Sequence, residues 1–165
     1  MSSNRLRVVF DVNIYVDAIS HASSKFPYLS SLPPKTENSA ADCLSLALDD
    51  EDFELYISPH ILLNTAKVLR DEIGVAPKRV EAILTAFTEI VHCTQGSIVD
   101  PKRMNHDQKD FEDNLVLDLV RETESLILVT SDNELLRQNP WNGRLILRPN
   151  KFVEQIMRAR IMRNK

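Results

Sequence analysis

The amino-acid sequence predicts an α/β fold in three α/β/α layers, with a central parallel sheet covered by helices on both faces. Two observations carry this prediction. Short apolar runs recur along the chain, and they alternate with longer segments whose apolar residues have helical spacing. Strands that alternate with helices favour a parallel sheet, because a right-handed crossover returns the chain to the same end of the sheet.

The length and composition are those of one compact domain. The chain has 165 residues, of which 43% are hydrophobic, and this suffices for a sizeable core. We therefore interpret residues 1–165 as a single domain that ends in a basic strand and helix over 144–165. Three glycines, 6% aromatic residues and the lack of a repeated segment make solenoids and propellers poor fits.

In the first half of the chain the pattern predicts two strands and four helices. The strands are Leu6 to Phe10 and Phe53 to Ile57, both short and apolar. Helices are expected over 13–19, over 40–48, from Ser58 and Pro59 to near Gly74, and from Pro77 onward, with the two later ones forming a hairpin. Serine followed by proline is a strong helix start. Residues 21–39, rich in Ser, Pro and Lys, are expected to be an extended connection.

The second half of the chain continues the alternation. A polar loop over 94–106 precedes a helix that begins near 107–110, and the clearest buried strand follows at Leu126 to Thr130. After the turn at 139–143, a strand over 144–147 and a helix from about Asn150 complete the chain. In parallel sheets of this kind ligands bind beyond the carboxyl ends of the strands, so polar residues placed there are informative.

The cysteines and the N-terminal segment indicate where the protein resides. Cys43 and Cys93 are far apart in apolar stretches, without the CxxC spacing of zinc sites or a disulfide framework, so we expect reduced, buried thiols. No secretory signal opens the sequence, and no run approaches the roughly 18 apolar residues that span a bilayer. We expect a cytoplasmic protein with no membrane association.

The net charge of −4 is unevenly distributed. Residues 144–165 contain seven basic residues and one acid, so this segment carries +6 and the remainder −10. The acidic body argues against a protein that coats DNA. Within the basic end, Arg158, Arg160 and Arg163 are candidates for contacts with an RNA backbone. A solvated helix face, or a docking face for a partner, are the alternatives.

Acidic residues are predicted to meet at one edge of the sheet. Asp11 directly follows the first strand, and Asp132 follows the strand that ends at Thr130. Parallel neighbouring strands would bring both carboxylates to the same rim. A third group, formed by Asp110, Glu112 and Asp113, opens the helix that leads into the strand at 126–130 and therefore starts at that rim as well. Each acid alone also suits a turn or a helix N-terminus.

Carboxylates that converge in this way predict a divalent metal site. They repel one another at neutral pH, and a cation resolves the repulsion. Hard oxygen ligands without a paired-cysteine or HxxxH motif suit Mg²⁺ or Mn²⁺ better than zinc. A water on such a metal becomes a better nucleophile, and charge developing on a phosphodiester is stabilised. The expected reaction is phosphodiester hydrolysis.

Two stretches of the sequence resemble the motifs of a known family. The opening VVFDVNIYVDA resembles the first motif of PIN domains, and DFEDNLVLDLVRETESLILVTSDNELL resembles the signature in which an acid-rich helix start leads to a strand ending in T-x-D. The order and spacing of elements agree over nearly the whole chain. The sequence is most similar to VapC-like toxins, which are metal-dependent ribonucleases restrained by an antitoxin protein.

The resemblance implies a three-layer PIN fold and a set of site residues. It makes Asp11, Asp113 and Asp132 the catalytic and metal-binding acids, with Mg²⁺ or Mn²⁺ as cofactor, RNA as substrate, an antitoxin as partner and a homodimer as the expected assembly. Further residues are implied around them: Glu112, Asp110 and Glu134 are additional candidate ligands, and Asn13, Asn64, Thr130 and Ser131 are candidate supporting residues.

One departure from the family pattern keeps an alternative open. Many PIN enzymes carry a glutamate in the helix after the second strand, where this chain has Asn64. A neutral amide is a weaker metal ligand, so a catalytically weakened PIN-like module that binds RNA or protein is the main rival. His60 lies one turn before Asn64, and we interpret it as a surface or partly buried histidine rather than a ligand.

Two other phosphate-handling α/β classes fit less well. A haloacid-dehalogenase-like phosphatase needs a second aspartate two positions after the first, and that position is Asn13. A response-regulator receiver needs a phosphorylatable aspartate after its third strand and a later lysine, and we can place neither.

Overall fold

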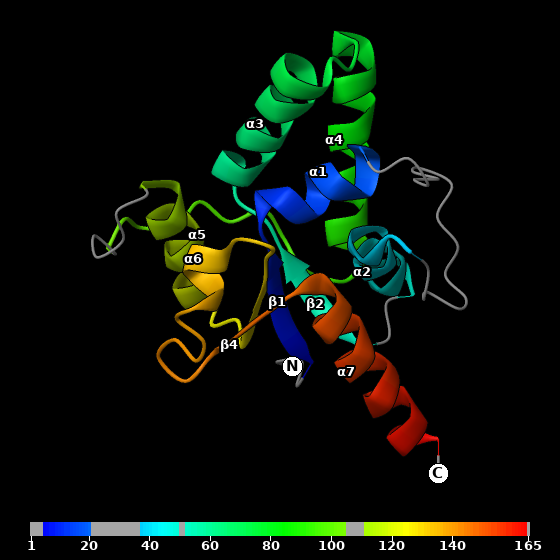
Figure 1. Cartoon of the computed structure of the whole chain (residues 1–165), viewed down its shortest axis with the longest axis vertical. Helices are drawn as coiled ribbons and strands as arrows, with labels where there is room; N and C mark the ends of the chain where they lie inside the picture. Colours follow the sequence, from blue (N-terminus) through cyan, green and yellow to red (C-terminus); the bar gives the residue numbers. More distant parts are fainter. Residues whose placement is uncertain (1–4, 21–36, 50–51, 105–110, 165) are drawn as a thin grey trace.

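A computed structural model describes residues 5–20, 37–49, 52–104 and 111–164. Most of the predicted connection over 21–39 and the predicted helix start at 107–110, with Asp110, lie outside these described residues. Figure 1 shows a small sheet surrounded by helices, with a long C-terminal helix extending away from the body.

Four short strands form one parallel sheet. They are β1 (Leu6–Phe10), β2 (Phe53–Tyr56), β3 (Ile127–Val129) and β4 (Leu145–Leu147), in the order β2-β1-β3-β4. All three pairings are parallel. Each strand is a run of mainly apolar residues, which favours an extended, buried conformation. The predicted α/β class and parallel sheet are confirmed, and each predicted strand is found within one residue of its expected ends.

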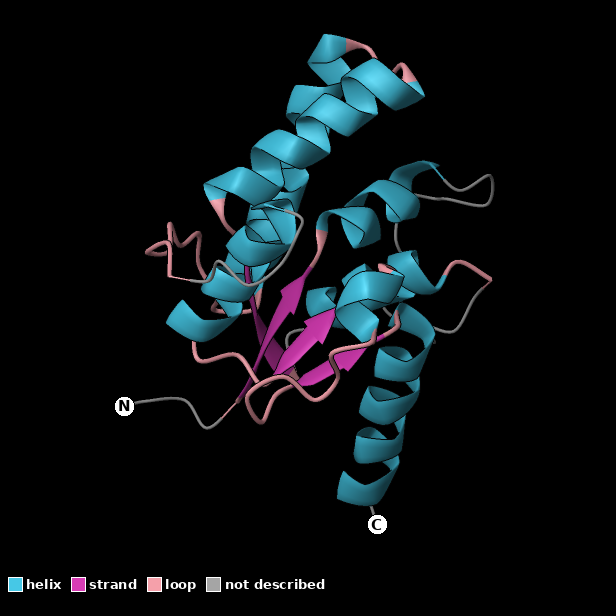
Figure 2. Cartoon of the chain, turned by 60° about the vertical axis from the view of Figure 1, so that its left-hand side comes forward, coloured by secondary structure: helices cyan, strands magenta, loops and turns pink. Residues whose placement is uncertain are grey.

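Helices connect the strands and cover the sheet on both sides, as Figures 1 and 2 show. They are α1 (Val12–Ser20), α2 (Ser39–Leu48), α3 (Pro59–Lys67), α4 (Pro77–Cys93), α5 (Phe111–Glu122), α6 (Asn133–Leu136) and α7 (Pro149–Arg163), together with a π-helical segment, η1 (Val68–Ile73). The Ser58 hydroxyl caps α3 by accepting the N–H of Ile61, and Pro59 opens the helix as predicted.

The helical hairpin predicted after the second strand is present, with one difference. Its tip projects away from the sheet in both views, with α3 and η1 forming one arm and α4 the other, while the C-terminal part of α4 packs against β2 and α2 (Figures 1 and 2). The single helix expected from Ser58 to Gly74 is divided at Val68, where α-helical turns give way to π-helical ones. Gly74 ends this arm with φ of +82°, a conformation that glycine adopts without steric cost.

An aromatic cluster forms the centre of the core and joins distant parts of the chain. Phe10 packs against Tyr15, Phe53 and Phe152, with ring centroids 5.7–6.1 Å apart. Phe152 belongs to α7, so the C-terminal helix shares the core that β1 and β2 build. Because neighbouring residues of a strand face opposite sides, Val9 faces the layer that contains α5.

The strand order creates a switch point between β1 and β3. From β1 the chain continues to β2 on one side, while from β3 it continues to β4 on the other side. The loops that leave β1 and β3 therefore diverge and leave a crevice beyond the carboxyl ends of these two strands. Open α/β sheets bind their ligands in such crevices.

The arginines of α7 hold this helix to the segment before β2. The Arg160 guanidinium lies 2.8 Å from a carboxylate oxygen of Asp49 and 2.6 Å from one of Asp52, and Arg163 also pairs with Asp52 at 2.6 Å. Only 12% of the Arg160 side chain and 4% of the Asp52 side chain are exposed. Arg160 and Arg163 were candidate RNA contacts, and the structure shows them engaged with carboxylates of the same chain.

Replacing Arg160 with alanine is expected to lower the free energy of unfolding by about 2 kcal/mol, because it leaves two mostly buried carboxylates without their shared cation. Urea unfolding at neutral pH measures this change. Arg158→Ala is the matched control, since Arg158 is exposed on the same helix, and it should change stability by less than about 0.5 kcal/mol. Equal stability of the two variants would contradict the structural role given to Arg160.

The two cysteines differ in their surroundings. Cys43 is buried, as predicted, but Cys93 is exposed, so the expectation of two buried thiols is wrong for Cys93. Cys93 is the last residue of α4, where the helix leaves the core, and apolar patterning does not resolve the face of a terminal residue. Among the residues that the structure describes, no helix is long and apolar enough to cross a membrane.

Candidate active site

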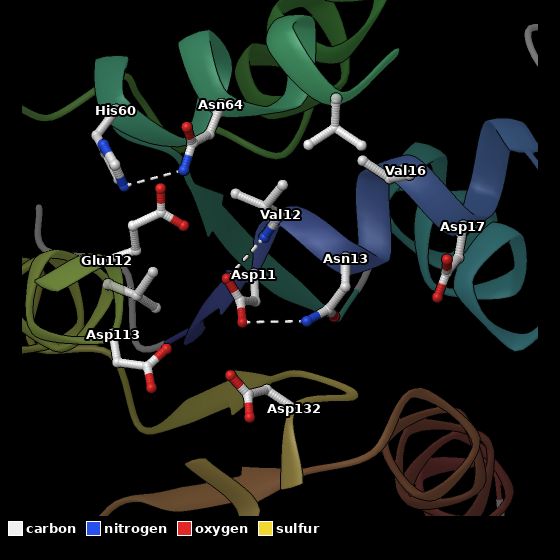
Figure 3. Close-up of a pocket in the computed structure, with 12 residues that line it drawn as sticks. Asp11, Val12, Asn13, Val16, Asp17, His60, Asn64, Glu112, Asp113 and Asp132 are labelled. Carbon is white, nitrogen blue, oxygen red and sulfur yellow. Dashed lines mark hydrogen bonds between the residues drawn. The ribbon is translucent and has the colours of Figure 1, made fainter. Parts of the chain in front are cut away.

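A cavity of about 240 Å³ opens at the crevice between the carboxyl ends of β1 and β3. Twelve residues line it: Asp11, Val12, Asn13, Val16, Asp17, His60, Asn64, Val68, Glu112, Asp113, Val116 and Asp132. Asp11, Asp113 and Asp132, the three acids singled out in the sequence, face this common space (Figure 3). They come from three separate segments: the end of β1, the start of α5 and the loop after β3.

The Asp11 carboxylate is held in one orientation by three donors. The main-chain N–H of Val12 donates to Oδ1 at 2.8 Å. The hydroxyl of Thr130 and the amide of Asn13 both donate to Oδ2, at 2.8 Å and 3.2 Å. The side chain of Asp11 is almost fully buried, with 7% exposure of the residue. Charged acceptors make strong hydrogen bonds, so this carboxylate is rigidly placed.

Thr130 and Asn13 connect the two loops of the switch point. Thr130 Oγ1 accepts the N–H of Asp132 at 3.0 Å, while its own hydrogen goes to Asp11. Asn13 Oδ1 accepts the N–H of Ser131 at 3.0 Å. Three of the four candidate supporting residues, Asn13, Thr130 and Ser131, take part in this network, with Ser131 contributing its main-chain N–H. The network fixes the position of Asp11 relative to Asp132.

Asp132 and Asp113 are both placed by helix starts. Asp132 is the N-cap of α6, and its Oδ1 accepts the N–H of Glu134 at 2.9 Å. Asp113 lies in the first turn of α5 and is buried, with 7% exposure. The N-terminus of a helix stabilises negative charge, which allows these two carboxylates to remain near each other and near Asp11.

The electrostatics of the cavity oppose further negative charge. Burial raises the pKa of Asp11, its hydrogen bonds to Thr130 and Val12 act in the opposite direction, and the charge of Asp132 raises it again. Five carboxylate residues line the cavity, and its described lining contains no lysine or arginine. Ionising Asp11 in the folded protein therefore costs free energy that a bound cation would offset.

The donor set fits a hard divalent cation. Carboxylate and amide oxygens are the ligands that Mg²⁺ and Mn²⁺ prefer. Within the described part of the chain, no three His, Cys, Asp or Glu side chains already stand in an arrangement that could hold a metal ion. Asp11, Asp113 and Asp132 are nevertheless the residues whose carboxylates would hold such an ion, because all three line the same cavity.

His60 and Asn64 line the cavity from α3. The amide nitrogen of Asn64 lies 3.4 Å from His60 Nε2, and Figure 3 shows Glu112 close to this pair. Burial lowers the pKa of His60, Glu112 raises it, and the positive charge of Arg103 lowers it again. The sequence placed Asn64 near the acids and His60 one turn before it, and His60 is partly buried, as one of the two interpretations of this histidine predicted.

Other predicted residues lie elsewhere. Glu134 is not in the cavity lining; it is exposed and pairs with Arg137 at 2.7 Å. Asp110 is outside the described residues. Asp17 lines the cavity but was not singled out from the sequence, although its position one helical turn after Asn13 on α1 is a signal that could have found it. Figure 3 shows Asp17 at the far side, away from the three central acids.

The fold and the acidic cavity at its switch point define an α/β domain with a cluster of carboxylates beyond the ends of its parallel strands. A family model described as PIN domain matches residues 7–134. The chain belongs to the PIN domain family, whose members are generally nucleases and typically use divalent metals. A search of curated proteins found no match to the chain. The residues after 134, which include β4 and α7, extend beyond the matched range and contribute Phe152 to the common core.

Proposed function

We propose that this protein is a metal-dependent endoribonuclease that hydrolyses phosphodiester bonds of RNA in the cytoplasm. The observation that supports this most is the meeting of Asp11, Asp113 and Asp132 in one cavity at the switch point of a PIN fold. Asp11 lies more than 100 positions before Asp113 and Asp132 in the sequence, so only the fold brings the three residues together.

Each site residue has a role in this proposal. Asp11, Asp113 and Asp132 would hold Mg²⁺ or Mn²⁺, which when bound supplies an activated water and positive charge for the phosphate. Thr130 and Asn13 keep the Asp11 carboxylate turned toward the cavity through their hydrogen bonds. The buried position of Asp11 excludes bulk water from one side of the site and strengthens its interactions with charge.

The biological role that we propose is that of the toxin in a toxin–antitoxin pair. The support is the similarity of the two quoted sequence motifs to those of VapC-like toxins. An antitoxin protein would be its partner, and the chain would act as a homodimer. A free toxin of this kind would degrade RNA until the partner blocks the cavity.

A catalytically weakened PIN module that binds RNA or protein is the second candidate. Asn64 favours it, because an amide lines the cavity where many PIN enzymes have a carboxylate. The side-chain amide nitrogen of Asn64 is also engaged with His60 Nε2, at 3.4 Å. Glu112, on the facing helix α5, would supply the missing charge if the protein is an enzyme.

Incubation of the purified chain with end-labelled single-stranded RNA separates the two candidates. The expected result is cleavage in Mn²⁺ or Mg²⁺, its loss in excess EDTA and its return when the metal is restored in excess. Gel analysis of the labelled products should show internal cuts rather than stepwise shortening from one end. Binding of the RNA without metal-dependent cleavage would identify the weakened module instead.

A further inference from the structure

An arginine and an exposed aromatic ring are stacked beside the acidic cavity. The guanidinium carbon of Arg103 lies 4.9 Å from the ring centroid of Phe111. Phe111 is the first residue of α5 and immediately precedes Glu112 and Asp113, which line the cavity. Both members of the pair are exposed, and 56% of Phe111 is accessible to solvent.

The position of Arg103 relative to the cavity follows from its contact with Phe111, which immediately precedes Glu112 and Asp113 of the cavity lining. The lowering of the His60 pKa by the charge of Arg103 agrees with this position. His60 and Glu112 both line the cavity, on the side where α3 faces α5 (Figure 3). The Arg103–Phe111 pair therefore borders that side of the cavity.

Phe111 is not explained by packing of the core. Single exposed apolar residues are common on protein surfaces and by themselves carry no function. Leu126 is an example, with 54% exposure one residue before β3, at the opposite end of the sheet from the cavity. Phe111 differs from Leu126 in two ways. The guanidinium of Arg103 lies over its ring, and the next two residues, Glu112 and Asp113, line the acidic cavity.

The chemistry of the pair complements what the cavity lacks. The carboxylates that line the cavity repel the phosphates of a nucleic acid. The substrate therefore needs a binding contact nearby that does not involve these acids. A guanidinium attracts phosphate, and an aromatic face or a guanidinium plane stacks with any base. Such platforms bind single strands, whose bases are open for stacking, rather than duplexes.

We propose that Arg103 and Phe111 form a platform that stacks an unpaired base of single-stranded RNA and presents the neighbouring phosphodiester to the acidic cavity. This inference rests on the proposed function, because it assigns a binding subsite for the same RNA substrate. It predicts that cleavage prefers unpaired segments, with little dependence on the identity of the stacked base.

Fluorescence anisotropy with a labelled single-stranded RNA tests the platform without cleavage, in buffer that contains Ca²⁺ in place of Mg²⁺ or Mn²⁺. Phe111→Ala should weaken binding about tenfold and Phe111→Trp should restore it. Leu126→Ala, which removes a similarly exposed side chain far from the cavity, should bind as the wild type does. Circular dichroism melting confirms that each variant is folded.

A second RNA with abasic positions in its centre isolates stacking from charge. The wild type should bind this RNA about as weakly as Phe111→Ala binds the normal RNA, and Phe111→Ala should lose nothing further. Arg103→Ala should weaken binding of both RNAs and lower the salt dependence by about one phosphate contact, whereas Arg79→Ala, an exposed arginine at the start of α4, should not.

Unchanged RNA binding by Phe111→Ala, or no RNA binding by the wild type, would overturn the platform. Unchanged binding by Phe111→Ala together with metal-dependent cleavage would leave the proposed nuclease standing and refute this inference alone. Loss of binding in Phe111→Ala without any cleavage by the wild type would refute the nuclease and support the platform in a binding module.

Discussion

The variant Asp132→Asn is expected to reduce metal-dependent RNA cleavage by at least about 100-fold. Loss of a residue that only hydrogen-bonds to a metal ligand already lowers metal affinity or activity by about 10–100-fold, and Asp132 is a candidate ligand itself. Asparagine is as good an N-cap as aspartate, so α6 keeps its first hydrogen bond, from the N–H of Glu134. The substitution therefore removes a charge from the cavity with little effect on folding. Initial rates of RNA cleavage and a thermal melt measure the two effects.

Asp132→Asn is a cleaner test than Asp11→Asn. Both oxygens of Asp11 accept hydrogen bonds, from Val12, Thr130 and Asn13. An asparagine there would turn its NH₂ group toward one of these donors, so loss of activity could result from a disturbed network. Asp71→Asn is the matched control, because Asp71 is a half-exposed aspartate on the helical hairpin that pairs with Arg70 and does not line the cavity. Cleavage by Asp132→Asn at the rate of Asp71→Asn would refute the role of Asp132.

The substitution Gly96→Ala is expected to destabilise the fold by about 3 kcal/mol or more, the upper range for overpacking. A Cβ at Gly96 would lie 1.8 Å from the carbonyl oxygen of Leu55 and 2.7 Å from its carbonyl carbon. Leu55 cannot yield, because it is in β2, and its N–H donates to Thr94 Oγ1 at 2.8 Å. The loop cannot retreat easily either, since the Gly96 N–H donates to Val91.

Denaturant unfolding compares Gly96→Ala with Gly74→Ala. Gly74 has φ of +82° but open space around its Cβ position, so alanine there should cost only about 1–2 kcal/mol, the price of the left-handed conformation. A soluble Gly96→Ala variant that unfolds at the same denaturant concentration as Gly74→Ala would show that the contact with Leu55 is not rigid.

Local patterns sufficed to predict the strands and the three central acids. Each strand is a short apolar run, and Asp11 and Asp132 follow two of them. Because parallel strands end at one edge, the pattern placed both acids at the same rim, and the adjacency of β1 and β3 in the strand order brings them together. The same reasoning predicted the group Asp110, Glu112 and Asp113, since a helix that leads into a parallel strand starts at that edge, and the resemblance to PIN domains selected Asp113 from this group.

Residues that reach the cavity through helix packing could not be predicted in this way. Asp17 lines it because α1 turns one face toward it, and such a face is fixed by contacts between helices rather than by local sequence. The change to π-helix at Val68 is equally hidden, since apolar spacing of 3–4 residues does not distinguish the two helix types over one turn.

The basic C-terminal segment shows how a charge count can mislead. The sequence displays the arginines of α7, but it does not show that Asp49 and Asp52, more than a hundred residues earlier, are their partners. Two of the three candidate RNA-binding arginines, Arg160 and Arg163, are in these ion pairs. Positive charge near the cavity comes instead from Arg103, whose sequence neighbourhood gave no signal.

The central claim is that carboxylates from three segments form one divalent-cation site, and calorimetric titration with Mn²⁺ tests it most directly. The wild-type chain should bind Mn²⁺, Asp132→Asn should bind it at least about tenfold more weakly, and Asp71→Asn should bind it as the wild type does. Absence of Mn²⁺ binding by the wild type, or equal affinity in Asp132→Asn, would contradict the claim.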